Sequence, residues 1–228
     1  MPQRVPFGCL ALAVIMGMLV IFPLLLADLA LHALAKLGLT GPVSLLVILG
    51  VLFGGFINIP VKKIPREEKI QVPRIALFGI GQFLPSLVTR RTYTIIAINF
   101  GGCIIPTGIA FYELWRLGIE GTGPLLIGLL AVAINIVVCY YASRPVPNVG
   151  IAMRPFIPAI IAALCGILLL PQLAPPVACA AGVLGPLIGA DLFHLKDIGG
   201  VRTGVASIGG AGTFDGIVLS GFIATLLA

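Results

Sequence analysis

Long apolar runs separated by short polar segments dominate the pattern of the chain. The apolar residues within each run are continuous rather than alternating, which favours membrane-spanning α-helices over the strands of a β-barrel. We therefore expect an all-α polytopic bundle that forms one integral membrane domain over 1–228. Seven runs are expected to cross the membrane, over residues 7–31, 43–59, 94–115, 124–141, 156–170, 174–190 and 204–227.

A further apolar stretch, IALFGIGQFLPSLV at 75–88, is short for a membrane span. It contains two glycines, a glutamine and a proline, and fits a re-entrant or interfacial segment better than a crossing helix. The stretch just before it, VKKIPREEKIQVPR at 61–74, is the most polar part of the chain. We expect it to be a cytoplasmic loop that contacts anionic lipid headgroups.

The distribution of basic residues predicts the orientation of the bundle. If 75–88 does not cross and the N-terminus is cytoplasmic, then all of the 14 Lys and Arg residues except Lys36 and Arg116 lie on the cytoplasmic side. If 75–88 crosses, the bias disappears. The positive-inside rule therefore predicts seven spans, with the N-terminus inside and the C-terminus outside. The expected location is the plasma membrane of a prokaryote, as a multi-pass protein.

Composition supports the membrane assignment and narrows the function. Hydrophobic residues make up 59% of the chain, charged residues only 10%, and the mean hydropathy is +1.17. The net charge of +6 comes largely from loops between apolar runs, so it does not indicate nucleic acid. The five cysteines are scattered without a CxxC pair, and no nucleotide, flavin or NAD motif is present. We expect no cofactor.

The expected partners are the lipid bilayer, a membrane peptide or a small ion, and a second copy of the chain.

Asp215 is the first candidate for chemistry. It lies in SIGGAGTFDGIVLSGF, inside the last apolar run. An ionised Asp at the centre of a membrane helix costs about 2.5–3.5 kcal/mol, so such an acid is a functional candidate by default. A protonated Asp that only hydrogen-bonds to a neighbouring helix is the alternative. Glycines and hydroxyls surround it and would permit a broken helix or a polar site, namely Ser207, Gly209, Gly210, Gly212, Thr213 and Gly216.

A second group of polar residues lies in LIGADLFHLKDIGG at 187–200. Asp191, His194 and Asp197 follow one another at intervals of three, and their side chains are of metal-binding types. No second His or Cys lies at ligand spacing, so we expect no metal. Asp191 ends the sixth apolar run, and a short loop could bring it to Asp215. Two close carboxyls share a proton, so one can act as base and the other as acid in hydrolysis.

Three asparagines lie within apolar runs and complete the candidate residues. Asparagines in membrane helices often hydrogen-bond across the bundle. The alternative is that they line a polar cavity. The residues are Asn58, Asn99 and Asn135.

The segment GADLFHLK resembles the Gly-x-Gly-Asp or Gly-Gly-Ala-Asp element of the membrane aspartyl peptidases, especially the prepilin and preflagellin peptidases. The resemblance implies that Asp191 is one catalytic acid, with Gly189 as the glycine two residues before it. GGAGTFDGI gives a second, inexact likeness at Asp215. The chain departs from the peptidase pattern because the only earlier acid expected at membrane depth is Asp28, far away in the chain, and no early Asp…Ile-Pro element is present. Glu113 also precedes Asp191, but we expect it to pair with Arg116 at an interface.

The whole chain resembles a family of prokaryotic multi-span membrane proteins of unknown function. The glycine-rich GADLFHLKDI and GGAGTFDGI elements carry this resemblance. It implies a polytopic helical fold and supplies no activity.

Three functions therefore remain open. The first is an aspartyl intramembrane peptidase-like protein that uses Asp191 and Asp215, which requires the two carboxyls to meet beside an accessible groove. The second is an ion- or proton-coupled transporter or channel, with Asp215 at a glycine-broken helix. The third is a non-catalytic accessory subunit, in which Asp215 is dry and packed. In the first two, the site would be lined by Gly189, His194, Asp197, Ser207, Gly210, Gly212, Thr213, Asn58, Asn99 and Asn135.

Overall fold

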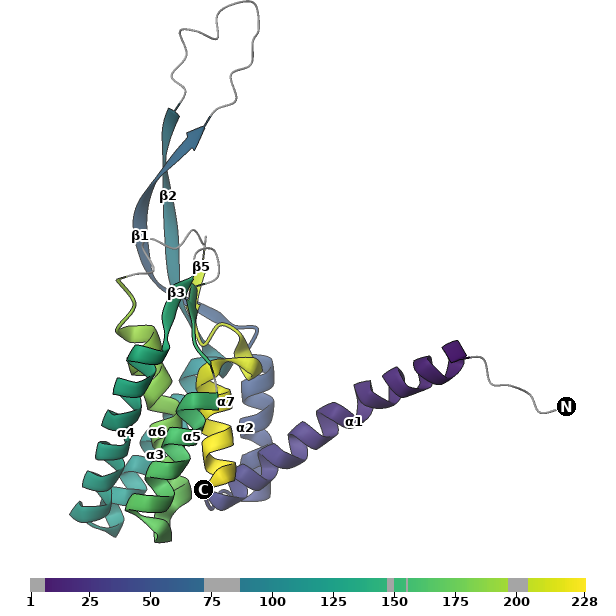
Figure 1. The fold of residues 1–228 in the computed structure, drawn as a ribbon, viewed down its shortest axis with the longest axis vertical. Coiled ribbons are helices and arrows are strands. Elements are labelled where there is room, and N and C mark those ends of the chain that lie inside the picture. Colours follow the sequence, from purple (N-terminus) through teal and green to yellow (C-terminus); the bar gives the residue numbers. More distant parts are fainter. Residues whose placement is uncertain (1–6, 72–86, 147–149, 155, 197–204) are drawn as a thin grey trace, which may run out of the picture.

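The chain folds into a helical bundle from which a long β-hairpin projects (Figure 1). The computed structural model describes residues 7–71, 87–146, 150–154, 156–196 and 205–228. The α-helices run in chain order as α1 (Phe7–Lys36), α2 (Gly41–Gly54), α3 (Ile105–Glu120), α4 (Thr122–Ala142), α5 (Phe156–Leu169), α6 (Ala174–Gly185) and α7 (Gly216–Leu227). Short helical turns extend them, at η2 (Phe100–Ile104), η3 (Pro171–Leu173), η4 (Pro186–Leu192) and η6 (Gly212–Phe214).

Helix α6 lies at the centre of the bundle and packs against α3, α4, α5 and α7. Nearly all of its residues are buried, and half of them are alanine or glycine. Small residues let helix backbones approach closely. A Cβ on Gly182, for example, would lie 2.9 Å from the Cα of Gly221 on α7. The core is therefore built from close helix contacts rather than from large side chains.

Large apolar side chains cover the outside of the bundle instead. Leucine, isoleucine and phenylalanine side chains on α1, α2, α4 and α5 are exposed. Within the described part of the chain, two helices are long and apolar enough to cross a membrane, Thr122–Ala142 and Pro171–Leu192. Helices α2, α5 and α7 are apolar but shorter. The seven predicted spans are thus matched only in part.

A three-stranded sheet lies at one end of the bundle, in the order β1-β2-β5. Strands β1 (Asn58–Gln71) and β2 (Leu87–Asn99) form the antiparallel hairpin, and β5 (Val205–Ile208) pairs in parallel with β2. Pro60 and Pro65 are tolerated in β1 because it is an edge strand. A separate two-stranded sheet joins β3 (Arg144–Val146) and β4 (Gly150–Ala152).

These strands correct the all-α prediction in three places. The predicted loop at 61–74 is part of β1 as far as Gln71. The predicted span at 94–115 begins as strand, because β2 continues to Asn99. The predicted span at 204–227 contains β5 and turns, and only Gly216–Leu227 is α-helical. The cause is that β-branched apolar runs suit a strand as well as a membrane helix. Most of the 75–88 segment lies outside the described residues.

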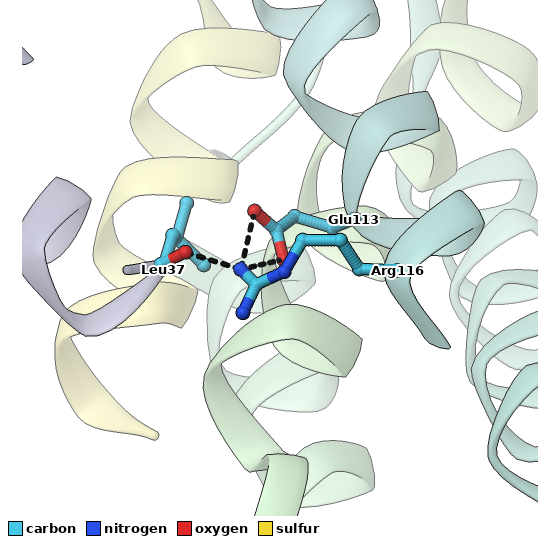
Figure 2. A network of polar contacts seen from close by, with 3 residues as sticks. All are labelled: Leu37, Glu113 and Arg116. Atoms are coloured by element: carbon cyan, nitrogen blue, oxygen red, sulfur yellow. Dashed lines mark hydrogen bonds and ion pairs between the residues drawn. The ribbon is translucent and has the colours of Figure 1, made fainter. Parts of the chain in front are cut away.

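A polar network ties the end of α1 to the bundle, at the end opposite the hairpin. Figure 2 shows Arg116 between the carboxylate of Glu113, 3.0 Å away, and the backbone carbonyl of Leu37, to which it also donates. Glu113 is fully buried, so this ion pair satisfies its charge. Lys36 donates to the carbonyl of Leu226 at 2.7 Å. Lys36 and Arg116, the two cations predicted to lie outside, are therefore at the same end of the molecule.

Candidate functional site: two acids in one pocket

A pocket of about 360 Å³ lies where the sheet meets the bundle. Strand β5 and the turn that follows it form most of its wall. Asp191 and Asp215, which come from different elements, both line it. Its full lining is Ile151, Asp191, Val205, Ala206, Ser207, Ile208, Gly209, Gly210, Ala211 and Asp215. Asp191 and Asp215 thus line the same pocket, and the close approach of their carboxyls stays a prediction.

Asp215 is the N-cap of α7 rather than a residue inside a helix, which corrects its predicted position. Its Oδ1 accepts a hydrogen bond from the Ile217 amide at 3.0 Å, and its Oδ2 accepts one from the Ala211 amide at 3.3 Å. Gly209 and Gly212 have φ of 70° and 61°, values that favour glycine, and they form the turn that precedes it. The glycines therefore shape a turn that presents the acid at a helix N-terminus.

The environment of Asp215 acts on its charge in two directions. Burial raises the pKa of the Asp215 carboxyl above its ordinary value, and this is the largest effect. The amides of Ile217 and Ala211 act against the rise, because they stabilise the carboxylate. The N-terminal end of α7 also favours a negative charge at this position. Asp215 is thus a desolvated acid whose ionised form has fixed hydrogen-bond donors.

Asp191 comes from a different element, η4, and also lines the pocket. It lies near the end of the continuous helical segment formed by α6 and η4. Its side chain lies beside the backbone amide of Gly209, and the charge of Asp215 acts on it electrostatically. The last turn of a helix carries unpaired carbonyls and does not stabilise a negative charge. The two acids therefore occupy helix ends of opposite polarity.

Asparagine side chains hold β5 beside this pocket. The Asn99 amide group donates to the Gly55 carbonyl at 2.7 Å and to Asn58 Oδ1 at 3.1 Å, and Asn99 Oδ1 accepts from the Gly102 amide at 2.7 Å. Ser207 of β5 donates its hydroxyl hydrogen to Asn58 Oδ1 at 2.5 Å. The predicted site residues Asn58 and Asn99 thus support the pocket through Ser207, and neither lines it.

Backbone contacts between glycines fix the turn in front of Asp215. A Cβ on Gly102 would lie 2.0 Å from the carbonyl oxygen of Gly209, and a Cβ on Gly101 would lie 2.2 Å from the carbonyl oxygen of Val51. Gly212 meets Gly55, at the end of α2, in the same way. Strand β5 and its turn are therefore seated directly on the backbones of η2 and α2.

Other predicted site residues lie elsewhere in the structure. Gly189 is buried against α4, where a Cβ would lie 2.2 Å from the carbonyl oxygen of Ile136. His194 is buried, stacks on Tyr140 with ring centroids 4.9 Å apart, and its Nδ1 lies 2.9 Å from the Ala190 carbonyl oxygen. These residues pack α4 against η4 and do not line the pocket.

The remaining predicted residues divide between the pocket and the packing around it. Ser207 and Gly210 line the pocket, whereas Thr213 lines an apolar cavity between α1, α2 and α7. Asn135 is fully buried and donates to the carbonyl of Ala181 on α6 at 2.7 Å. Asp197 lies outside the described residues. Among the residues that the structure describes, no group of three or more His, Cys, Asp or Glu side chains is placed to hold a metal ion.

Strand β5 and Ile151 are the parts of the site that the sequence analysis missed. The run VASI has the β-branched and small residues of a short strand, but it sits within an apolar stretch that also fits a membrane helix. Nothing in the sequence around Ile151 indicates a functional site, because its place in the pocket depends on where the β3–β4 hairpin lies in the fold. Only the tertiary structure brings it to the two acids.

Comparison with known proteins identifies a family but no characterised relative. Residues 52–227 match the model of a family described as "Protein of unknown function (DUF1614)". This match contains the whole pocket lining, both acids included. No curated protein and no solved structure matches the chain.

Proposed function

The chain belongs to this family of unknown function, and we propose that it is a membrane-embedded aspartyl hydrolase that cleaves peptide bonds with Asp191 and Asp215. The observation that carries the proposal is that two acids distant in sequence line one pocket. Paired carboxyls held at different protonation states are the machinery of aspartyl hydrolysis. The local resemblance of GADLFHLK to the membrane aspartyl peptidases points the same way.

We also propose that the bundle crosses the plasma membrane of a prokaryote seven times. The exposed leucine, isoleucine and phenylalanine side chains on the outer helices support this, because lipid would cover them. Helices α2 to α7 alternate in direction along the chain, as successive spans do, whereas α1 leaves the bundle at a wide angle (Figure 1). Exposed cations at the pocket end include Arg144, Arg154 and Lys196, so this end would face the cytoplasm.

The polarity of the two helix ends assigns the roles of the acids. Asp215, with two amide donors, is the base, and Asp191 is the acid that holds the proton. The Asp215 carboxylate takes a proton from water as the water oxygen attacks the peptide carbonyl carbon. Asp191 gives its proton to the carbonyl oxygen. Collapse of the tetrahedral intermediate breaks the C–N bond, and the proton gained by Asp215 passes to the leaving nitrogen. As the C=O bond re-forms, one hydroxyl of the intermediate returns its proton to Asp191, so both acids regain their starting protonation. One water is consumed, and an acid and an amine are formed.

The neighbouring strand suits a peptide substrate. Strand β5 pairs with β2 on one side, and no other described strand pairs with its second edge. All four of its residues line the pocket that contains the acids. An extended peptide can add to such an edge through main-chain hydrogen bonds. The pocket would thereby hold a peptide bond next to Asp191 and Asp215.

Substitution of the two acids in the reconstituted protein tests the proposed hydrolysis. Purified protein in lipid vesicles is incubated with a library of apolar peptides in H₂¹⁸O, and products are read by mass spectrometry. We expect Asp191→Asn and Asp215→Asn each to lower cleavage at least about 10³-fold, because either change removes one of two required proton carriers. Asp28→Asn is the matched control, since Asp28 is exposed on α1, pairs with His32 and does not line the pocket.

Three outcomes separate the functions that the sequence left open. Cleavage with ¹⁸O in the new carboxyl group, lost in both pocket variants and kept in Asp28→Asn, supports the hydrolase. Ion flux across the vesicles that Asp215→Asn abolishes, with no cleavage, would replace the hydrolase by a transporter. If neither cleavage nor ion flux is found, and both variants function normally in cells, the chain is an accessory subunit.

A further inference from the structure

We propose that the β3–β4 hairpin determines the specificity of the pocket, with Ile151 selecting an aliphatic side chain next to the bond that is cleaved. The inference rests on the proposed hydrolase function and names the substrate class of the same site. Ile151 is the pocket residue contributed by this hairpin, and it comes from neither the β5 segment nor the helix that carries Asp191.

The hairpin is seated on the segment that carries Asp215. Ile151 lies in β4, and Met153 directly follows the last residue of that strand, Ala152. Ile151 lines the pocket, and the Met153 Cε lies 3.4 Å from the position of a Cβ on Gly216. Gly216 directly follows Asp215. The Met153 contact therefore places Ile151 at the acids.

The pocket has apolar lining from two separate elements, which a bound side chain would contact. Strand β5 supplies Val205, Ala206 and Ile208, and the hairpin supplies Ile151. The volume of about 360 Å³ is at the small end of ligand pockets, so it admits a short stretch of chain. The apolar part of its lining is aliphatic, and no aromatic or basic side chain is among the described residues that line it. The two acids, Ser207 and backbone groups make the larger part of its surface polar.

Chemistry then predicts which residue the pocket accepts. An aliphatic side chain such as Leu or Val gains from contact with these walls. An acidic side chain would be repelled by the two carboxyls, and a bulky aromatic ring would meet Ile151. The expected substrate is an extended peptide with a Val- or Leu-sized residue beside the scissile bond.

Binding of transition-state mimics tests this without a known substrate. The probes are hydroxyethylene peptide isosteres that carry Ala, Val, Leu, Phe or Asp at the residue before the hydroxyl, because such mimics bind more tightly than substrates. For the unaltered protein in detergent, calorimetry should give at least tenfold tighter binding for Leu than for Asp. Ile151→Ala should lower the preference for Leu over Ala about tenfold and admit Phe. Ile151→Phe should exclude Leu and keep Ala.

Control variants separate this inference from the proposed function. Ile160→Ala makes the same truncation on an exposed position of α5 and should leave the order of affinities unchanged. If Asp191→Asn and Asp215→Asn weaken every mimic but the Ile151 variants keep the order of the unaltered protein, the specificity proposal is wrong and the hydrolase stands. If no mimic binds more tightly to the unaltered protein than to the Asp variants, both proposals fail.

Discussion

Asp215 owes its position to a turn of glycines rather than to a helix interior. At the N-cap of α7 its carboxylate accepts two backbone hydrogen bonds, which a mid-helix position would not offer because those amides bond within the helix. A charge buried in a membrane helix is costly in free energy. For the Asp215 carboxylate, the two backbone amide donors partly offset that cost. The turn makes an ionised acid compatible with this site.

This arrangement predicts the acidic side of the pH profile. If Asp215 is the base, activity is lost as pH falls through its pKa, because the protonated acid cannot accept a proton from water. Burial raises the pKa of Asp215, so the midpoint should lie above the ordinary value for Asp of about 3.9. The measurement is kcat/KM for peptide cleavage between pH 3 and pH 8. A midpoint at or below about 3.9 would contradict the assignment of Asp215 as base.

At the scale of elements, β5 is held in place by glycine backbones. The contact between Gly102 of η2 and Gly209 leaves no room for a side chain at either position. The pocket wall and the turn before Asp215 therefore depend on Gly102, which does not itself line the pocket.

Substitution of Gly102 tests this dependence. We expect Gly102→Ala to lower cleavage more than tenfold and to cost about 1–3 kcal/mol of stability, because its Cβ would lie 2.0 Å from the Gly209 carbonyl oxygen. Gly108→Ala is the matched control, since a Cβ there meets nothing within 4 Å. Cleavage assays and thermal unfolding in detergent give the two readouts. Equal activity of the two variants would show that the contact does not position the site.

The elements also show how far the sequence could predict this fold. The continuous apolar runs located α4, α5 and α6 closely, because each run is long enough that a helix is the expected element. It failed for Thr94–Asn99 and for β5, because hydropathy does not distinguish an apolar strand from an apolar helix. Asp191 and Asp215 could be chosen from the sequence as acids in apolar surroundings. Ile151 could not, since its role arises from the docking of a separate hairpin.

At the scale of the whole molecule, polar groups gather at the two ends of the bundle rather than on its outer surface. The core is formed by small residues of α6, and large apolar side chains lie on the outer faces of the helices. The β1–β2 hairpin and β5 lie at one end of the bundle, and α1 meets the bundle at the other (Figure 1). Strand β5 lines the pocket, whereas Lys36, Glu113 and Arg116 join the end of α1 to the bundle. This separation is the order that a membrane would impose on the two ends of a spanning bundle.

The proposed orientation can be tested by cysteine labelling of intact cells. In a background whose native cysteines are replaced by alanine, Lys36→Cys should react with a membrane-impermeant maleimide, because Lys36 is exposed at the end predicted to lie outside. Lys196→Cys and Lys62→Cys, at the pocket end and on the hairpin, should react only after permeabilisation. Labelling of the latter two in intact cells, with Lys36→Cys protected, would reverse the orientation. Asp191 and Asp215 would then act on the outer side of the membrane, on substrates that have already crossed it.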